Sequence, residues 1–277
     1  MRRFFPYYGA KHSCARMYPA PRFGHIVEPF AGSAAYSHLW GADNDVTLIE
    51  KNPRVAAIWK WLIGVSEDEL ASLPGIDKFE HIGETGLPDG PAREFLRQWC
   101  SDSSVGGRPS VSKLMGAQTR AGAWCFDSKH SRTFAANLRH IRHWRVVCGE
   151  YHSSLDFIAG ALTYTPSRTR AKATWFIDPP YQRGGEWYEP KSCKASALDF
   201  QALSAWCSSR WGDVIVCEGD CADWLPFGRV KAAPVKRTDS GFGSAQRSEL
   251  VWYRRDGATV EPWNIGSFCA PGQETLF

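Results

Sequence analysis

The chain has 277 residues, of which 43% are hydrophobic and 22% charged, so it can bury a substantial core and is not an intrinsically disordered protein. Its formal charge of +4 is compatible with a phosphate-bearing partner but does not by itself indicate one. No run of about 18 apolar residues occurs and the first residues lack the apolar core of a signal peptide, so we expect a cytosolic protein without a membrane span.

Taken in chain order, the first elements are those of a parallel sheet. Residues 25–28 are a short apolar run, a small-residue turn follows at 29–33, and residues 34–40 are helix-like. Residues 46–50 then have the pattern of a buried strand, and Pro53 begins a helix with apolar residues at helical spacing. Strand, turn, helix, strand and helix in this order predict an α/β fold with a parallel sheet.

A second group of elements lies further along the chain. Residues 174–177 and 213–217 are apolar runs with the pattern of buried strands, and residues 197–209 between them are helix-like. Residues 249–253 are predicted to form the last strand of the same sheet.

The segment between the two groups has a different character. It begins with an acidic helical stretch at 67–73, continues through loop-rich sequence, and ends with Phe134, Leu138 and Ile141 at helical spacing beside basic residues. We therefore predict one α/β domain assembled from residues 1–65 and 146–255, a mainly helical insertion at 66–145, and a flexible tail at 256–277.

The sharpest motif is Asp178-Pro179-Pro180-Tyr181, directly after the strand at 174–177. Neither proline can donate to a strand ladder and both fix φ, so the strand ends there with a stiff backbone. The motif then presents an acid and an aromatic ring at the carboxyl edge of the sheet, where α/β folds bind ligands. The alternative is a strand-ending turn with an Asx-type cap.

These groups suit chemistry on the amino group of adenine, which is a poor nucleophile because its lone pair is conjugated into the ring. Hydrogen bonds from that amino group to the Asp178 carboxylate and the Pro179 carbonyl would draw it toward tetrahedral geometry and raise its nucleophilicity. Tyr181 would stack on a base flipped out of a duplex and replace the stacking that the base loses.

A second motif, Glu28-Pro29-Phe30-Ala31-Gly32-Ser33-Ala34, is a small-residue turn after the first strand. Gly32 would let the backbone approach a ligand closely, and the next strand ends in an acid, Glu50. An acid about 20 residues beyond such a turn, binding ribose hydroxyls, is the arrangement of nucleoside-binding folds. Because the turn has only one glycine, an ordinary βα turn is the alternative.

Taken in order, these motifs resemble those of the Dam-type, alpha-order DNA adenine-N6 methyltransferases. In addition, Pro6-Tyr7-Tyr8-Gly9-Ala10-Lys11 resembles the family's Pro-Tyr-x-Gly-x-Lys segment, and Asp156-Phe157 resembles its Asp-Phe or Asp-Tyr cofactor contact. The resemblance implies a Rossmann-like S-adenosylmethionine-dependent methyltransferase fold, in which the helical insertion is the DNA-recognition part.

The resemblance also implies roles for individual residues. The catalytic residues would be Asp178, Pro179, Pro180 and Tyr181. The residues in contact with S-adenosylmethionine would be Tyr7, Lys11, Pro29, Phe30, Gly32, Ser33, Glu50, Asp156, Phe157 and Asp178. The chain departs from the family at Ala34, where a second glycine is usual, and at Glu50, where Asp is commoner.

Double-stranded DNA is the partner that the resemblance implies for the insertion. Basic side chains would contact phosphates, which gives affinity and register but no sequence information. Gln118 and Arg120 are types that suit adenine and guanine, with solvated loop residues as an equal alternative. The predicted DNA-binding residues are Gln118, Arg120, Lys129, Arg132, Arg139 and Arg142. His140 and His143 lie one helical turn apart without a third ligand, so we predict a basic helix face and no metal.

The chain ends in Gln273-Glu274-Thr275-Leu276-Phe277. This sequence resembles the Gln-x-x-Leu-Phe peptide by which many bacterial replication and repair proteins bind the DNA sliding clamp. Gln273, Leu276 and Phe277 would be the residues that enter the groove of the clamp. An arbitrary chain end is the alternative.

We therefore expect adenine in DNA to be flipped into the pocket at Asp178 and methylated by direct in-line transfer, with no metal and no covalent intermediate. An RNA adenine-N6 methyltransferase is the nearest alternative, because the same pocket accepts a base from either polymer. Cytosine-N4 methylation is less favoured, since those enzymes tend to have Ser in place of Asp178. A non-catalytic DNA- or clamp-binding protein on the same fold is the alternative from another class.

Overall fold

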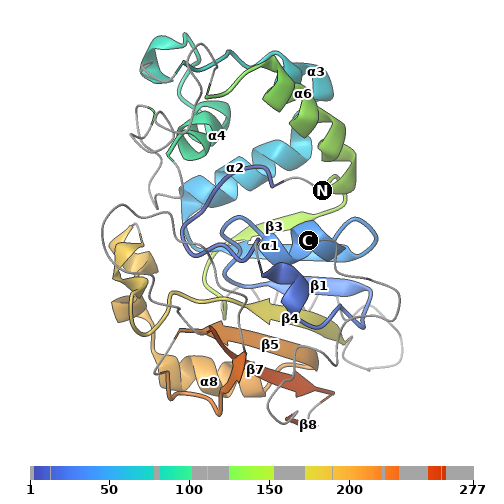
Figure 1. Ribbon diagram of the computed structural model, residues 1–277, viewed down its shortest axis with the longest axis vertical. Helices are drawn as coiled ribbons and strands as arrows, with labels where there is room; N and C mark the ends of the chain where they lie inside the picture. The colour runs from blue at the N-terminus through green and yellow to red at the C-terminus, as the bar shows by residue number, and fades with distance from the viewer. Residues whose placement is uncertain are drawn as a thin grey trace.

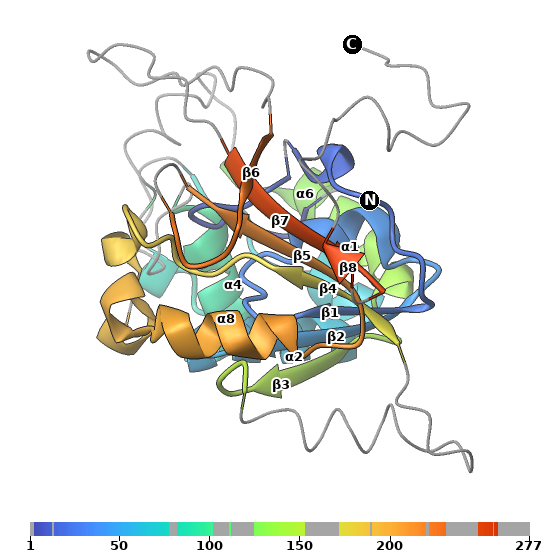
Figure 2. The same cartoon turned by 90° about the horizontal axis from the view of Figure 1, so that it is seen from below.

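Eight strands of this computed structural model form one sheet, whose order is β3-β2-β1-β4-β5-β7-β6 with β8 paired to β7 (Figures 1 and 2). Neighbouring strands from β1 to β5 are parallel, and β7 runs antiparallel to β5, β6 and β8. The strands are β1 His25–Glu28, β2 Asp45–Glu50, β3 Arg145–Cys148, β4 Ala173–Ile177, β5 Gly212–Glu218, β6 Gly228–Val230, β7 Glu249–Arg255 and β8 Ala258–Thr259.

The structure describes residues 3–12, 14–77, 82–101, 111, 125–152, 172–188, 190–219, 222–230, 249–256 and 258–259. Its α-helices are α1 Ala35–Trp40, α2 Pro53–Gly64, α3 Glu67–Ala71, α4 Pro91–Trp99, α6 Ser128–Asn137 and α8 Phe200–Ser208. Its 3₁₀ turns are η1 Ala15–Met17, η2 Ile82–Glu84, η3 Leu138–His140, η4 Gly185–Trp187, η5 Lys191–Cys193 and η6 Ala195–Ala197.

The sheet is covered on both faces, and its side chains alternate between two hydrophobic cores. Ile26, Leu48 and Phe176 face the core that contains α1, α2, α4 and α6, whereas their neighbours Val27 and Ile49 face the core that contains α8. Figure 2 shows α8 alone on the near face of the sheet and the other helices behind it. This layering confirms the predicted α/β fold class with a mostly parallel sheet.

The order of the strands reverses between β1 and β4. From β1 the chain moves outward through β2 to β3, and it then returns to place β4 on the other side of β1. The loops that leave the carboxyl ends of β1 and β4 therefore diverge and leave a crevice, which is where open α/β sheets bind ligands. Both motifs singled out from the sequence begin at this crevice, because Pro29 follows β1 and Asp178 follows β4.

Capping residues explain where the helices begin. Asn52 accepts a hydrogen bond from Arg54 N–H ahead of Pro53 in α2, and Asp127 accepts from the amides of residues 129 and 130 in α6. Asp199 caps α8 in the same way through Ala202 N–H. The predicted start at residue 197 was therefore too early, because residues 195–197 form a separate 3₁₀ turn ahead of that cap.

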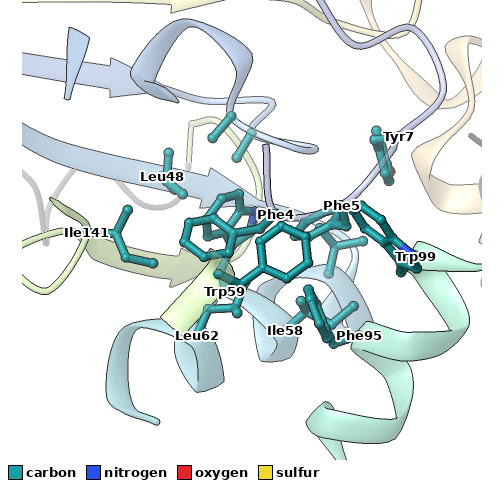
Figure 3. Packing of buried hydrophobic residues seen from close by; sticks show 14 of the residues in the cluster. Phe4, Phe5, Tyr7, Leu48, Ile58, Trp59, Leu62, Phe95, Trp99 and Ile141 are labelled. Atoms are coloured by element: carbon teal, nitrogen blue, oxygen red, sulfur yellow. The ribbon is translucent and has the colours of Figure 1, made fainter. Parts of the chain in front are cut away.

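The described residues of the predicted insertion share a core with the start of the chain. Phe4 and Phe5 pack against Trp59 of α2, and Phe134 of α6 packs against Phe4 (Figure 3). Phe134, Leu138 and Ile141 are all fully buried, which confirms the buried side predicted from their helical spacing. The N-terminal segment is thus packed between the sheet and the helices of residues 66–145.

Two further expectations concern the chain end and the membrane. Ala258–Thr259 pairs with β7 as β8, so the predicted flexible tail begins too early at residue 256. In the part of the chain that the structure describes, no helix is both long enough and apolar enough to span a membrane.

Candidate active site

A pocket of about 770 Å³, counting its open mouth, lies at the crevice between β1 and β4. The walls combine aromatic rings with a few charged groups, as small-molecule sites usually do. The predicted cofactor residues that line it are Tyr7, Lys11, Pro29, Phe30, Gly32, Ser33, Glu50 and Asp178, and Pro180 of the catalytic motif joins them.

The turn after β1 is fixed by hydrogen bonds to the next strand and helix. Ala31 N–H donates to Ile49 O (3.1 Å), and Gly32 N–H donates to Glu50 Oε2 (2.8 Å). On the other side, Trp59 Nε1–H of α2 donates to Gly32 O (2.7 Å). Gly32 has a φ of +47°, a conformation that glycine adopts without steric cost.

Ala34, which follows this turn, also has a left-handed backbone. Its φ is +50° and its ψ +51°, in the left-handed region that costs a side chain with a Cβ about 1–2 kcal/mol. Ala34 is also fully buried in front of α1. The turn therefore keeps the geometry of a glycine here although the residue is alanine.

Glu50 ends β2 with its carboxylate oriented by backbone amides. Oε2 accepts from Gly32 N–H, and Oε1 accepts from Asn52 N–H (2.7 Å). Burial raises the pKa of Glu50, and hydrogen bonds from the amides of Asn52, Gly32 and Lys51, together with the charge of Arg54, oppose that rise. A carboxylate offers about four lone-pair sites, so these amides leave capacity for a hydroxyl of a ligand.

The N-terminal segment lies across the pocket. A Cβ added at Gly32 would lie 2.8 Å from Tyr7 Cδ1, so the Tyr7 ring rests directly on the turn. Four residues later, Lys11 Nζ donates to Gly9 O (2.9 Å) and pairs with Asp178 Oδ1 (2.8 Å). Tyr7 thus belongs to the β1 side of the pocket and Lys11 to the β4 side.

Asp178 is in a mostly buried site beside a cation. Burial raises its pKa to about 6, the ammonium of Lys11 opposes the rise, and the carboxylate of Glu249 adds to it. Burial alone would lower the pKa of Lys11, but Asp178, Tyr181 and Glu249 together hold it well above its usual range. At neutral pH the pair is therefore a carboxylate and an ammonium.

Tyr181 lies beside Asp178, and a hydrogen bond between their side chains lowers the pKa of Asp178. The Tyr181 hydroxyl also donates to Glu249 Oε1 (3.3 Å), and Lys11 Nζ lies 4.6 Å from the centre of the Tyr181 ring. A Cβ added at Gly219 would meet the ring at 2.8 Å. The carboxylate of Glu218 accepts from Gln182 N–H (3.2 Å) and fixes the backbone directly after the motif.

Glu28 at the end of β1 is a second buried acid near this pair. Its Oε1 accepts from Ser37 N–H of α1 (2.6 Å). Burial raises the pKa of Glu28 to about 8, the hydrogen bonds of Ser37 oppose the rise, and Asp178 adds to it. Glu28 is therefore mainly protonated at neutral pH and joins the turn to α1 without adding a full charge.

The remaining predicted cofactor residues divide into two groups. Phe30 stacks on Tyr151 with 5.5 Å between ring centres, and the buried Ser33 Oγ is hydrogen-bonded to His12 Nε2 (3.1 Å). Asp156 and Phe157 lie outside the described residues. The same is true of Gln118 and Arg120 in the insertion and of the tail residues Gln273, Leu276 and Phe277.

The basic residues predicted to bind DNA are exposed but are not gathered around the pocket. Lys129, Arg132, Arg139 and Arg142 all lie on the solvent side of α6 and the turn that follows it. Arg142 donates to Ile63 O (2.6 Å) just before β3 begins, at the amino edge of the sheet. Arg142 is therefore at the opposite edge of the sheet from the pocket.

Several pocket residues were not predicted from the sequence. Tyr151 and Tyr188 line the pocket, and Glu249 contacts both Lys11 and Tyr181. The one signal for Glu249 was its place as the first residue of the predicted last strand. In an antiparallel strand, that end lies at the carboxyl edge of its parallel neighbours.

No family model matches the chain, and no curated protein matches it either. The geometry of the pocket and the chemistry of its side chains are therefore the basis for a functional proposal.

Proposed function

We propose that the chain is an S-adenosylmethionine-dependent methyltransferase that methylates the N6 amino group of a flipped adenine in DNA. The observation that carries the proposal is the meeting of three distant sequence motifs in one pocket. The N-terminal segment, the turn after β1 with Glu50, and two residues of the motif after β4, Asp178 and Pro180, line the crevice where the strand order reverses. Pro179 and Tyr181 of that motif are not among the residues that line the pocket. A chance set of strand-ending turns would not be expected to converge on one cavity with these residue types.

The strand order gives independent support. Its first part, β3-β2-β1-β4-β5, follows the order of doubly wound nucleotide-binding sheets. The antiparallel β7 lies between β5 and β6, so the sheet is mostly but not entirely parallel. The coarse fold is thus compatible with the Rossmann-like methyltransferase fold that the sequence implies.

The side chains of the pocket fit S-adenosylmethionine. Glu50 is oriented toward the pocket with capacity left for a ribose hydroxyl, and Gly32 leaves the turn open to a close approach. The rings of Tyr7, Phe30 and Tyr188 offer apolar and π surface, which suits both an adenine ring and a cationic sulfonium. When bound, this group supplies a methyl on a positively charged sulfur, which can pass directly to a nucleophile.

The residues of the chain would then act on the base. The Asp178 carboxylate would accept a hydrogen bond from the amino group, and the Pro179 carbonyl a second one, which frees the lone pair of the nitrogen from the ring. Tyr181 would supply a stacking surface beside them. After transfer the nitrogen carries one proton too many, and that proton passes to solvent or to Asp178. Because Asp178 must be ionised to accept, activity should rise with pH through a value near 6.

The test incubates the protein with methyl-labelled S-adenosylmethionine and either unmethylated plasmid DNA or RNA, followed by sequencing for modified bases. Asp178→Ala is run beside it. N6-methyladenine at a recurrent DNA motif, absent with the variant, is the expected result. Label in RNA alone would replace the proposal with an RNA methyltransferase. Absence of transfer to either polymer would overturn the substrate class, and absence of cofactor binding in calorimetry would overturn the fold-based proposal as well.

A further inference from the structure

Glu249 is an acid of the candidate site to which the proposed mechanism gives no role. It is the first residue of β7, and the register of β7 on β5 pairs Leu250 with Glu218, so Glu249 lies at the carboxyl edge of the sheet. Its Oε1 accepts a hydrogen bond from the Tyr18 hydroxyl and one from the Tyr181 hydroxyl (3.3 Å). Two phenol groups from distant parts of the chain therefore hold this carboxylate in place.

The Lys11 ammonium lies between this carboxylate and that of Asp178. Nζ is 2.8 Å from Asp178 Oδ1 and 3.9 Å from Glu249 Oε1. Lys11 is 6% exposed, so the ammonium depends on protein acceptors rather than on bulk water. The lysine side chain is flexible and offers three donors, so a small movement of Nζ exchanges one carboxylate for the other.

Binding of a base gives a reason for the Lys11 ammonium to move from Asp178 to Glu249. The proposed mechanism asks Asp178 to accept from the amino group of a base, at a carboxylate whose Oδ1 Lys11 already contacts. An ammonium that stayed on Asp178 would weaken the carboxylate as an acceptor, because its positive charge offsets the negative charge that attracts the amino group. An ammonium that left without a new partner would be a buried charge without compensation, which is strongly unfavourable.

We propose that Glu249 is a positioning residue that takes over the Lys11 ammonium when a base donates to Asp178. The inference rests on the proposed function, since it assigns a step in base binding at the same site. Through the Tyr181 hydroxyl, Glu249 also fixes the ring that would stack on the base. No bond is made or broken in this step, because a hydrogen-bonded ion pair is exchanged for another.

The acidity of Asp178 provides a readout that a purely structural role would not change. The titratable groups that interact with Asp178 come from every element packed around it. They are Lys11 and Cys14 from the N-terminal segment, Glu28 from β1, Cys217 and Glu218 from β5, Glu249 from β7, and Tyr181 and Tyr188 from the segment after β4. Burial raises the pKa of Asp178, Lys11 and a hydrogen bond of Tyr181 lower it, and Glu249 raises it. Removing the charge of Glu249 should therefore lower that pKa, whereas a loss of packing alone would leave it in place.

The experiment compares Glu249→Gln, which keeps an acceptor for both phenols, with Glu249→Asp, which keeps the charge. Glu186→Gln is the matched control, because Glu186 is an exposed acid of η4 whose hydrogen bond goes to Ser196 Oγ. With methyl-labelled cofactor and plasmid DNA, we expect Glu249→Gln to lose about tenfold or more in kcat. Its cofactor affinity should stay within about twofold of the wild type, and the acid limb of its kcat/KM profile should move to lower pH.

An NMR titration of the Asp178 carboxyl carbon, without cofactor or DNA, supplies the second readout. It should show a lower pKa in Glu249→Gln than in the wild type and an unchanged pKa in Glu186→Gln. Wild-type kcat together with an unmoved titration in Glu249→Gln would overturn the inference. If the wild type transfers no methyl group, the proposed function fails. The titration then still tests whether the charge of Glu249 acts on the Lys11–Asp178 ion pair. If Glu249→Gln does not fold, Glu249→Asp decides. We expect its kcat and the pKa of Asp178 to stay near the wild-type values. A tenfold loss of kcat with an unchanged pKa of Asp178 would contradict the inference.

Discussion

Replacing Gly32 by alanine tests whether the turn after β1 and the Tyr7 ring pack as one unit. The added Cβ would lie 2.8 Å from Tyr7 Cδ1 and 3.0 Å from Cε1, at a residue with a φ of +47°. The turn cannot easily retreat, because Gly32 is hydrogen-bonded to Glu50 on one side and to Trp59 on the other. The left-handed φ costs alanine about 1–2 kcal/mol and overpacking adds about 1–3 kcal/mol, so the variant should lose about 2–5 kcal/mol of unfolding free energy.

Gly86 provides the control that separates the cost of the left-handed φ from the cost of the contact with Tyr7. Its φ is +74°, and no atom lies within 4 Å of a Cβ added there, so Gly86→Ala has the backbone cost without the contact. It should lose about 1–2 kcal/mol, as measured by urea unfolding. In a double-mutant cycle, Tyr7→Ala should relieve the steric part of Gly32→Ala, which gives a coupling energy of about 1–3 kcal/mol.

The same variants connect this packing to the proposed function. A Tyr7 ring displaced by Gly32→Ala would move within the wall of the pocket, so calorimetry should show weaker binding of S-adenosylmethionine. The packing argument would be refuted if Gly32→Ala lost no more unfolding free energy than Gly86→Ala, or if the effects of Gly32→Ala and Tyr7→Ala were strictly additive. If Gly32→Ala loses the expected unfolding free energy but binds S-adenosylmethionine as the wild type does, only the place of Tyr7 in the cofactor site is refuted.

Three further predictions concern the turn, the core and the basic face. Ala34→Gly should keep both cofactor affinity in calorimetry and unfolding free energy in urea within about 1 kcal/mol, because relief of the left-handed φ offsets the lost buried methyl. His38 is buried with a pKa lowered by burial, so only the unfolded chain takes up its proton below pH about 6.5. Stability is therefore lost as pH falls, and from pH 7 to 5 the wild type should lose about 2 kcal/mol more than His38→Phe in urea unfolding. We expect Lys129→Glu to weaken DNA binding more than Arg142→Glu does, as measured by fluorescence anisotropy. The reason is that α6 runs toward the amino edge of the sheet, away from the pocket, and Arg142 lies at that edge. A larger effect of Arg142→Glu would place DNA on the amino edge.

The strands were predictable because they depend on local signals. An apolar run followed by prolines or a small-residue turn predicts where a buried strand ends, as before Pro29 and before the Asp178 motif. Parallel strands bring all such ends to one edge of the sheet, so both motifs were expected there, but their meeting in one crevice depends on β1 lying beside β4. The left-handed backbone at Ala34 was not predictable in this way, since alanine gives no sign of it.

The residues that were missed depend on the order of strands and on side-chain packing. Glu249 reaches Lys11 only because β7 is inserted beside β5 and runs antiparallel to it, and no periodicity in the sequence specifies either fact. Tyr151 is placed by its stacking on Phe30 rather than by any motif. The orientation of Tyr181 was likewise unpredictable, because its hydroxyl is directed by an acid far along the chain.

The N-terminal segment also connects the pocket to the helices of the predicted recognition insertion. Gln98 of α4 is fully buried, and its Nε2 donates to Pro6 O (2.9 Å). Its Oε1 accepts from Arg54 Nη2 of α2 (2.7 Å), which fixes the amide in the orientation that holds Pro6. A movement of α4 would therefore be transmitted to the backbone directly before Tyr7.

Under the proposed function, this arrangement gives a physical reason for cofactor and base to bind interdependently. Tyr7 rests on the turn after β1, on the side proposed for the cofactor, while Lys11, four residues later, pairs with Asp178 on the side proposed for the base. A ligand that shifts the segment at one of these contacts would also shift the other contact. By thermodynamic reciprocity, the factor by which the cofactor tightens base binding must equal the factor by which the base tightens cofactor binding. A short segment anchored to both sides of one crevice is sufficient for such coupling, and it requires no movement of the sheet.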